Sequence, residues 1–526
     1  MRGRTAVASG IVLSCLGACA DGQDVRRERA GAIEQARADR AEARRELRSH
    51  EGDIAIPTTL TLADAVRIAT LHNRDYESQR EQVYLDRVSL GLTRHLFRDP
   101  IFSGQLAYTF AGTRHGPYTN TASTRLGTTW LLPTGATVTA QADGSITQAS
   151  SGDRATGGST AVPPHTTATL AGTASISQPL LRGVAPYAFE PLTQAERDFV
   201  YEVRDFELFR QSFAIDVLAR YYQLVSQKQR VANARRSVEA LEFVAKRAKA
   251  FFDVDRTTKI DLLRAEQAHL RARNGLIDEE QSYKLALDRF KVFLGVPTAT
   301  SFEIPDDAAP LFVPVELDLD EAVHAALERR LDLLNAQMRL EDANRKVGVA
   351  RNALLPGLNA TGTYTIASDA YPGSSKLKLG FRDDSYEAGL VLDLGLERTA
   401  ERRNYRASLV QVDRARRALE QAEDSVVVEV RDSLRRLRQQ TQSITIQRAI
   451  IDTETARVKY SSIRYQAGEI DSRDLTESRQ SLLDAENSLI QNIVAYEIQR
   501  LTLLRQMGKL VVTDEGAIGD GRTGGE

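Results

Sequence analysis

The amino-acid sequence predicts a mainly α-helical protein with two β segments of membrane-crossing strand length, arranged as a duplicated unit. Three observations support this fold class. Long stretches without proline carry apolar residues at helical spacing. Two segments rich in glycine and threonine alternate apolar or small residues with polar ones. Short sequence matches recur between the two halves of the 526-residue chain, which indicates a repeated structural unit.

The N-terminus is typical of an exported protein. Arg2 and Arg4 precede a short apolar run over residues 6–16. A permanent transmembrane helix needs about 20 apolar residues, so this run predicts a cleaved signal peptide. The residues Leu16-Gly17-Ala18-Cys19 resemble a bacterial lipobox, in which the cysteine receives a covalent lipid. An ordinary signal peptide with a chance cysteine is the alternative.

From these features we expect a lipoprotein signal peptide over residues 1–18 and a lipid on Cys19. Residue 20 is alanine rather than the aspartate that favours retention in the inner membrane. Residues 19–55 are rich in arginine and glutamate and poor in large apolar side chains. They cannot bury a core, so we interpret them as a lipidated tether.

The repeat sets the domain boundaries. Residues 60–66 match residues 317–323 at an offset of 257, whereas Gly295 aligns with Gly508 at an offset of 213. The difference, 257 − 213 = 44, means that the first copy carries about 44 extra residues. We therefore predict a first repeat over residues 56–297, a second repeat over 298–510 and a disordered tail over 511–526.

Each repeat contains three predicted helices, the second of them very long. Phe206, Phe209, Phe213 and Val217 show the helical spacing in the first copy, and residues 426–437 show it in the second. A helix of about 65 residues is a rod on the order of 100 Å long, which must pack against other rods. The expected helices cover residues 62–96, 190–252 and 259–294, then 319–353, 398–466 and 472–507.

The β segments are expected at residues 100–180 and 356–396, each before a long helix. Stretches such as 103–110 and 386–394 alternate over eight to nine residues, close to the length of a tilted strand in a bilayer. A soluble sheet would alternate as well. The extra residues of the first copy contain a predicted hairpin over 124–142. It forms either an extracellular loop or two additional wall strands, and we favour the loop.

The doubled order of helix, strand pair, long helix, turn and helix behind a lipobox resembles the TolC-like outer-membrane efflux protein family, whose acylated members are outer membrane factor lipoproteins. The resemblance covers about residues 55–510. Local patterns agree: residues 175–180 (SISQPL) look like the exit from the second strand, and residues 353–356 (ALLP) like the entry into the third. Residues 465–468 (YQAG) look like the periplasmic tip.

The resemblance implies a homotrimer with a 12-stranded transmembrane β-barrel and a periplasmic α-helical barrel. Each subunit would supply four strands. Four strands alone leave two unpaired edges in lipid, and three subunits that close one barrel remove these edges. It further implies a periplasmic adaptor (membrane fusion protein) and an inner-membrane transporter as partners. The protein would be lipid-anchored in the outer membrane, with its helices in the periplasm. A net charge of −2 gives no indication of nucleic-acid binding.

Candidate gate residues lie near the predicted tip. Asp474 and Glu477 are three residues apart and share one helix face, so a trimer would present rings of carboxylates, which select cations. Capping of the helix N-terminus is an equally good explanation of Asp474. Asp261 is the equivalent in the first copy. Tyr465 resembles the family's tip tyrosine, and a Tyr465–Asp261 link is expected in the closed state.

The two predicted helix–helix turns are the expected adaptor-docking tip. Gly468 permits the positive φ of a tight turn, but its equivalent in the first copy is aspartate. A basic residue that the family carries near Ile470 is absent. The docking candidates are Asp253, Val254, Asp255, Arg256, Ala467, Gly468 and Glu469.

Enzyme chemistry is not indicated. The sequence contains no Walker loop, no G-x-S-x-G and no H-E-x-x-H motif, and its seven histidines are scattered. We expect no metal and no cofactor other than the covalent lipid on Cys19. The predicted function is the exit duct of a tripartite efflux system for small molecules or ions. A type I protein-secretion duct and a periplasmic coiled-coil scaffold without a pore are the alternatives.

Overall fold

The computed structural model describes residues 57–112, 118–151, 162–305, 308–315, 317–368, 381–513 and 518–520. The predicted signal peptide, the lipobox cysteine Cys19 and the tether over residues 19–55 lie outside the described residues. The chain divides into two units. Within the described residues, the smaller unit consists of residues 57–60 and 301–303. There Thr59 forms a parallel bridge with Glu303, whose amide donates to Thr58 O over 2.8 Å. The elements below belong to the larger unit.

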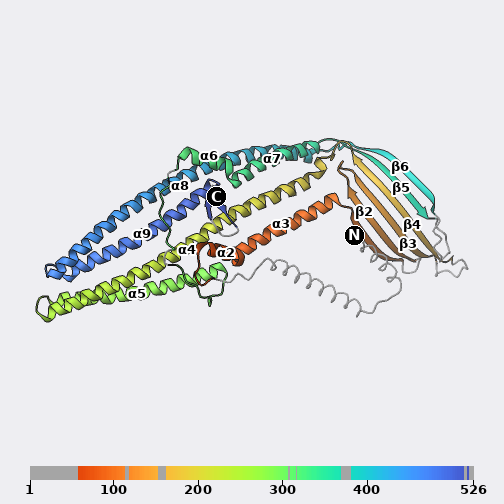
Figure 1. Ribbon diagram of the computed structural model, residues 1–526. Coiled ribbons are helices and arrows are strands. Elements are labelled where there is room, and N and C mark those ends of the chain that lie inside the picture. Colours follow the sequence, from red (N-terminus) through yellow and green to blue (C-terminus); the bar gives the residue numbers. More distant parts are fainter. Residues whose placement is uncertain are drawn as a thin grey trace. The chain divides into compact units, whose positions relative to one another are not determined.

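The helices follow the predicted duplicated order (Figure 1). The first repeat contains α2 (Leu62–His72), α3 (Arg74–Arg98), α4 (Glu190–Asp253) and α5 (Lys259–Leu294), with a short 3-10 turn, η1 (Tyr187–Phe189), before α4. The second repeat contains α6 (Leu319–Arg329), α7 (Leu331–Asn352), α8 (Thr399–Ala467) and α9 (Ser472–Gln506). Of these described helices, none has a stretch long and apolar enough to cross a membrane.

The first predicted helix of each repeat is broken into two. In the first copy the break is at Asn73, whose side chain accepts hydrogen bonds from the amides of Asp75 and Tyr76 and so caps α3. The amide of the same side chain donates to Phe293 O over 2.6 Å, which fixes the break against the end of α5. In the second copy the break is at Arg330, which forms ion pairs with Asp332 and Glu429.

One antiparallel sheet contains six strands in chain order, β1-β2-β3-β4-β5-β6 (Figure 1). The first repeat supplies β1 (Ile101–Gly112), β2 (Tyr118–Leu131), β3 (Thr137–Ser151) and β4 (Val162–Pro179). The second repeat supplies β5 (Gly357–Ser368) and β6 (Phe381–Asp393). Strands β4 and β5 pair directly, so the two repeats form one continuous sheet.

Two predictions are therefore wrong. The segment 124–142 is not a loop, because β2 pairs with β1 and with β3 along its length. The described chain accordingly supplies six strands rather than four to this sheet. The turn of this hairpin is held by the exit of β4: Thr134 Oγ1 donates to Gln178 Oε1 over 2.8 Å. Gly135 adopts φ +87°, and its ideal Cβ would lie 3.0 Å from Gly183 O, so the turn requires glycine.

The sheet has one apolar and one polar face. The register pairs even-numbered with even-numbered residues across all five strand pairs, apart from irregularities near Ser151 and Ser368. Because side chains alternate along a strand, even residues share a face. That face carries exposed Phe102, Leu106, Tyr108, Leu126, Ile146, Ile176, Tyr364, Tyr386 and Leu390. The odd face carries Ser103, Gln105, Ser123, Arg125, Gln141, Asp143, Ser145, Thr169, Thr173 and Thr363.

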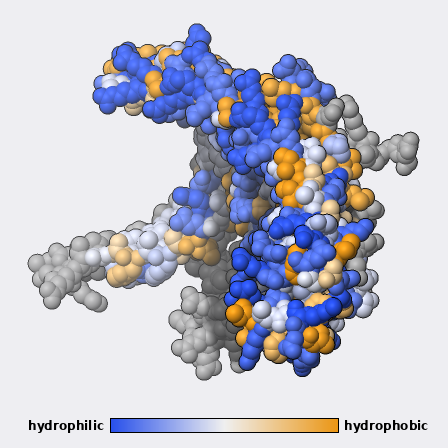
Figure 2. Space-filling view, turned by 90° about the vertical axis from the view of Figure 1, so that its left-hand side faces the viewer, coloured by the Kyte–Doolittle hydropathy of each residue, from blue (hydrophilic) through white to orange (hydrophobic). Residues whose placement is uncertain are grey.

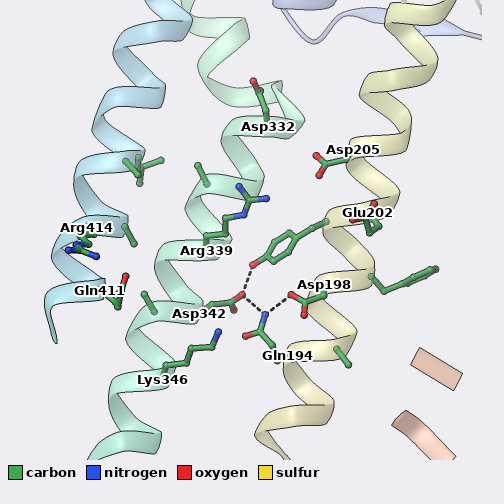
Figure 3. Close-up of a pocket in the computed structure, with 18 of the residues that line it drawn as sticks. Gln194, Asp198, Glu202, Asp205, Asp332, Arg339, Asp342, Lys346, Gln411 and Arg414 are labelled. Carbon is green, nitrogen blue, oxygen red and sulfur yellow. Dashed lines mark hydrogen bonds between the residues drawn. The ribbon is translucent and has the colours of Figure 1, made fainter. Parts of the chain in front are cut away.

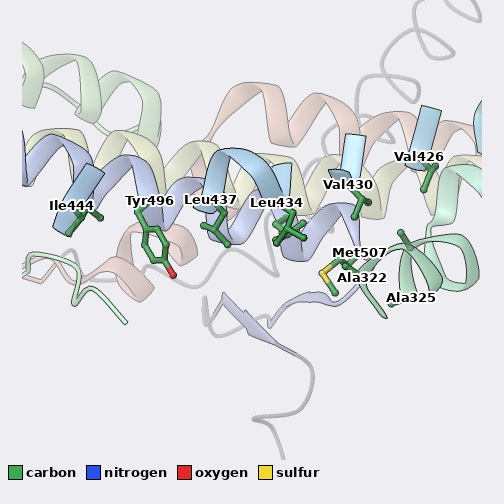
Figure 4. Close-up of a cluster of buried hydrophobic side chains, with 11 residues drawn as sticks. Ala322, Ala325, Val426, Val430, Leu434, Leu437, Ile444, Tyr496 and Met507 are labelled. Carbon is green, nitrogen blue, oxygen red and sulfur yellow. The ribbon is translucent and has the colours of Figure 1, made fainter. Parts of the chain in front are cut away.

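The helices pack through the predicted apolar stripes. In the second repeat, Val430 and Leu434 of α8 are buried against α9 and the alanines of α6 (Figure 4). Tyr496 of α9 closes this cluster, and its hydroxyl donates to Val313 O over 2.9 Å. In the first repeat the stripe is aromatic: Phe213 stacks on Phe293 of α5 with ring centroids 5.7 Å apart. Burial of these side chains supplies most of the cohesion between helices.

The C-terminal segment contains further structure. Strand β7 (Leu510–Val512) pairs with β8 (Ile518–Asp520), so the prediction of a disordered tail over 511–526 is wrong for these residues. The reason is burial: Leu510 and Val512 are almost completely buried, and the guanidinium of Arg210 donates to Val512 O. Leu510 joins a cluster with Ile215 and Leu218 of α4, which holds the chain end against the first repeat.

Candidate functional site

The two helical hairpins, α4–α5 and α8–α9, end in matching turns (Figure 1). Gly468 adopts φ +77° after α8, and Asp255, its equivalent at the offset of 213, adopts φ +55° after α4. The same backbone bond closes each turn, from Glu469 N to Arg464 O over 2.9 Å and from Arg256 N to Phe251 O over 2.8 Å. Asp255 thus adopts the left-handed conformation that usually favours glycine.

All seven predicted docking residues are exposed at these turns. The face on which the turns lie is mostly hydrophilic, with separate hydrophobic patches (Figure 2). Val254 is the exposed apolar side chain of the α4–α5 turn. Arg464 donates to Glu469 over 3.0 Å, and this hydrogen bond raises the pKa of the arginine. The exposed turns offer a surface for a partner, and their role in docking an adaptor stays a prediction.

Asp261 connects the two hairpins. Its side chain is only 5% exposed, and its Oδ1 accepts hydrogen bonds from Ser472 Oγ over 2.5 Å and from Ser472 N over 3.1 Å. Its other oxygen accepts from Thr257 Oγ1 over 3.0 Å. Asp261 is in the first turn of α5 and Ser472 is the first residue of α9, so one carboxylate joins the starts of both return helices.

Tyr465 is buried beside this connection, but its hydroxyl donates to Val244 O over 3.4 Å rather than to Asp261. The structure therefore differs from the expected Tyr465–Asp261 link, because Ser472 and Thr257 bind the carboxylate. Burial, and then the negative charge of Asp261, raise the pKa of Tyr465 to about 12. Tyr465 also packs in a cluster with Val244, Ala248, Ala265 and Leu475.

Asp474 and Glu477 are both exposed on the first turns of α9. Glu477 lies 3.6 Å from the guanidinium of Arg457 on α8, which partly compensates its charge. The N-cap position of α9 is Asp471, whose side chain makes no capping hydrogen bond. Asp474 is the acid of the first turn and is favourable to the helix dipole there. Both explanations of Asp474 remain open, and the carboxylate ring stays a prediction.

A second polar site lies between α3, α4, α7 and α8, where a groove of about 1230 Å³ is lined by acidic and basic side chains (Figure 3). Its buried centre is Asp342 of α7. The hydroxyl of Tyr201 donates to Asp342 over 2.5 Å, and the guanidinium groups of Arg197 and Arg345 donate over 2.8 and 2.6 Å. This network ties the long helix of the first repeat to the second repeat.

The charges of this network are strongly coupled. Burial alone would raise the pKa of Asp342, but hydrogen bonds from Tyr201 and Arg345 and the charges of both arginines outweigh burial and lower it. Burial, and then the hydrogen bond to Asp342, raise the pKa of Tyr201 to about 12. Sequence reasoning missed this network and also Ser472, because Tyr201 and Arg197 are more than 140 residues from Asp342 and Ser472 is 211 residues from Asp261. Within the described residues, no three side chains of metal-ligating type are grouped as a metal site would require.

Comparisons with known proteins agree on the fold. Residues 322–509 match the family model described as outer membrane efflux protein. The CmeC outer membrane channel of Campylobacter jejuni superposes with a TM-score of 0.62 at 16% identity, over 85% of this chain and 85% of that chain. CusC, a protein described as forming a transmembrane channel, superposes with a TM-score of 0.62 at 14% identity, over 87% of this chain and 94% of that chain.

The open state of the MtrE outer membrane channel of Neisseria gonorrhoeae superposes with a TM-score of 0.59 at 15% identity, over 85% of this chain and 88% of that chain. No curated protein sequence matches this chain. At these identities the similarity establishes the fold. The long helices followed by an antiparallel sheet are thus the architecture of these outer membrane channels.

Proposed function

We propose that this chain, whose second repeat carries the outer membrane efflux protein domain, is the outer-membrane channel subunit of a tripartite efflux system. It would conduct small molecules or ions passively. The energy would come from an inner-membrane transporter through a periplasmic adaptor. Cys19 would hold the lipid anchor in the outer membrane, and the helices would extend into the periplasm.

The observation that carries this proposal is a sheet with an apolar face, a polar face and two open edges. Phe102 on β1 is 80% exposed and Tyr386 on β6 is 87% exposed, although both are large aromatic residues. Such a face is stable against lipid and unfavourable against water. Unpaired edges of β1 and β6 are not tolerated in a bilayer, so copies of the chain must pair edge to edge into a closed wall.

The helices also require neighbours. Leu263, Leu270 and Ile277 are spaced seven residues apart on α5 and are exposed in the described chain. Ile446 and Tyr460, fourteen residues apart on α8, are exposed as well. Rows with a seven-residue period are typical of helices that pack side by side. A ring of three copies with a periplasmic helical barrel, as the family resemblance implies, would cover these side chains.

The hairpin tips fit the periplasmic entrance of such a channel. The bonds between Asp261 and Ser472 link the α4–α5 hairpin to the α8–α9 hairpin, so breaking them would weaken the link between the two hairpins. Asp474 and Glu477, exposed nearby, would add acidic rings that attract cations. The exposed turns around Val254 and Gly468 would receive the adaptor.

The test uses the full-length lipidated protein purified in detergent. Native mass spectrometry should give a trimer, and insertion into planar bilayers should give single-channel currents. A monomer that stays soluble without detergent once the acyl chains are removed would overturn the proposal. So would trimers that insert but never conduct, because those would fit a coiled-coil scaffold without a pore.

A further inference from the structure

The sheet contains more strands than the duplication alone requires. Each repeat has a strand pair before its long helix, β5 and β6 in the second copy and β1 and β4 in the first. The first copy carries the additional pair β2 and β3 between them. Residues 118–161, which begin with β2 and end just before β4, number 44, and this equals the length difference between the two repeats. The segment that contains β2 and β3 thus accounts for the extra length of the first copy.

Strands β2 and β3 have the properties of wall strands. They contain 14 and 15 residues, compared with 12 in β1 and 12 in β5, and all exceed the roughly 10 residues that cross a bilayer. Leu126, Trp130 and Ile146 lie on the same apolar face as Phe102. The indole nitrogen of Trp130 donates to Arg98 O over 3.0 Å, which joins the hairpin to the end of α3.

We propose that the outer-membrane wall of this channel has eighteen strands, six from each of three chains. The inference rests on the proposed trimer. It replaces the twelve strands that the family resemblance implies. Barrel diameter grows roughly linearly with strand number, so the wall is half as wide again: about 36 Å between opposite strand axes, compared with about 24 Å for twelve strands.

The polar face determines what this wider wall admits. It carries the ion pair between Arg125 of β2 and Asp143 of β3, 2.7 Å apart, whose charges cancel, and the exposed carboxylate of Glu387 on β6. Around this pair lie hydroxyl side chains, including Thr139 and Ser175, which are 2.5 Å apart, and Ser145 and Thr169, which are 2.8 Å apart. The exit is therefore wide and lined mainly by hydroxyl groups, so it suits bulky, polar cargo.

The direct experiment is electron cryomicroscopy of the full-length trimer in lipid nanodiscs. Eighteen strands in cross-section, with β1 of one chain paired to β6 of the next, are the expected result. A closed trimeric wall of twelve strands, with residues 118–151 outside it, would overturn this inference and leave the proposed function intact. Particles without any closed wall would overturn both.

A deletion of residues 118–161 provides the matched variant. Its length is even, so β4 keeps its apolar residues on the lipid face. The expected result is a trimer whose wall narrows to about two thirds of the wild-type diameter, as the loss of one third of the strands requires. A folded trimeric variant with an unchanged wall diameter would refute the inference. If the variant does not assemble, the number of wall strands that electron cryomicroscopy shows in the wild-type trimer decides between eighteen and twelve.

Discussion

Ser472 Oγ and Ser472 N both donate to one oxygen of Asp261, over 2.5 and 3.1 Å, and so fasten the start of α9 to the start of α5. The two residues are 211 positions apart and come from different repeats. Since both are buried, water cannot easily replace these bonds. We therefore expect this contact to hold the tips of the two hairpins together.

Replacing Asp261 with alanine should favour an open tip. The buried Ser472 amide then lacks its acceptor, which costs about 1–3 kcal/mol and shifts the populations on the order of tenfold. Single-channel recording should show a higher open probability. Ser472→Ala should give a smaller effect, because the backbone amide remains, and the double variant should be non-additive. Asp253→Asn, an exposed acid at the same tip, is the control. Equal recordings for Asp261→Ala and the control would exclude the contact from gating.

Replacing Asp474 and Glu477 with alanine should raise conductance and weaken block by divalent cations. Removal of a carboxylate ring relieves the close-range binding of divalent ions that obstructs the constriction. Asp474→Ala alone should account for most of the change, because Arg457 already compensates Glu477 over 3.6 Å. Divalent-cation titrations of the single-channel current provide the measurement. Asp484→Asn, ten residues further along α9, should behave like wild type. Unchanged block in the double variant would remove both acids from the gate.

The helices were predictable because their signal is local. The stripe from Val426 to Leu437 and the glycine at 468 together fix the identity and the end of α8, which the structure places at Ala467. The breaks at Asn73 and Arg330 were not predictable, since each depends on a partner from another helix, Phe293 for the first and Glu429 for the second.

Strand number and tip contacts required three-dimensional information. The alternation over residues 124–142 suits a loop hairpin as well as a wall hairpin, and only pairing with β1 and β4 distinguishes them. Ser472 was missed as a partner of Asp261 because a serine at the start of a helix normally indicates capping. The length difference of 44 residues between the repeats indicates two extra strands only if the inserted hairpin lies in the sheet. The structure shows that it does.

The two turn residues with positive φ should respond oppositely to substitution. Gly468→Ala should destabilise the α8–α9 tip by about 1 kcal/mol through backbone conformation alone, because no atom lies within 4 Å of the added Cβ. Asp255→Gly should relieve the strain of φ +55° and stabilise the α4–α5 tip by less than about 1 kcal/mol. Rates of limited proteolysis at each tip measure both effects. A slower cleavage in Gly468→Ala would contradict the left-handed turn.

Asp342→Asn should destabilise the junction between α4 and α7. The variant loses the carboxylate that accepts from Tyr201, Arg197 and Arg345, at a cost on the order of 2 kcal/mol. Urea unfolding of the detergent-solubilised protein, followed by circular dichroism, provides the measurement. Glu341→Gln is the control, since Glu341 pairs with the same Arg197 but its side chain is 64% exposed. Equal midpoints for the two variants would show that the network adds no stability.

The raised pKa of Tyr465 predicts an alkaline opening of the tip. A folded-state pKa of about 12, above the ordinary value of 10, means that the folded tip prefers the neutral hydroxyl. Its contribution to stability is therefore complete below about pH 10 and is lost as the pH rises towards 12. Ionisation places a phenolate beside the carboxylate of Asp261, and the repulsion should separate the two hairpins. The open probability of the wild-type channel should therefore increase over this range.

Tyr465→Phe isolates this effect from the ionisation of other tyrosines. The variant loses one hydrogen bond to Val244 O of 3.4 Å, which contributes at most about 1 kcal/mol, and it keeps the ring that packs against Phe251. It should gate like wild type at neutral pH and lack the alkaline increase in open probability. Tyr460→Phe, which removes an exposed hydroxyl on α8, should retain that increase. If Tyr465→Phe opens at the same alkaline pH as wild type, ionisation of Tyr465 does not drive the transition.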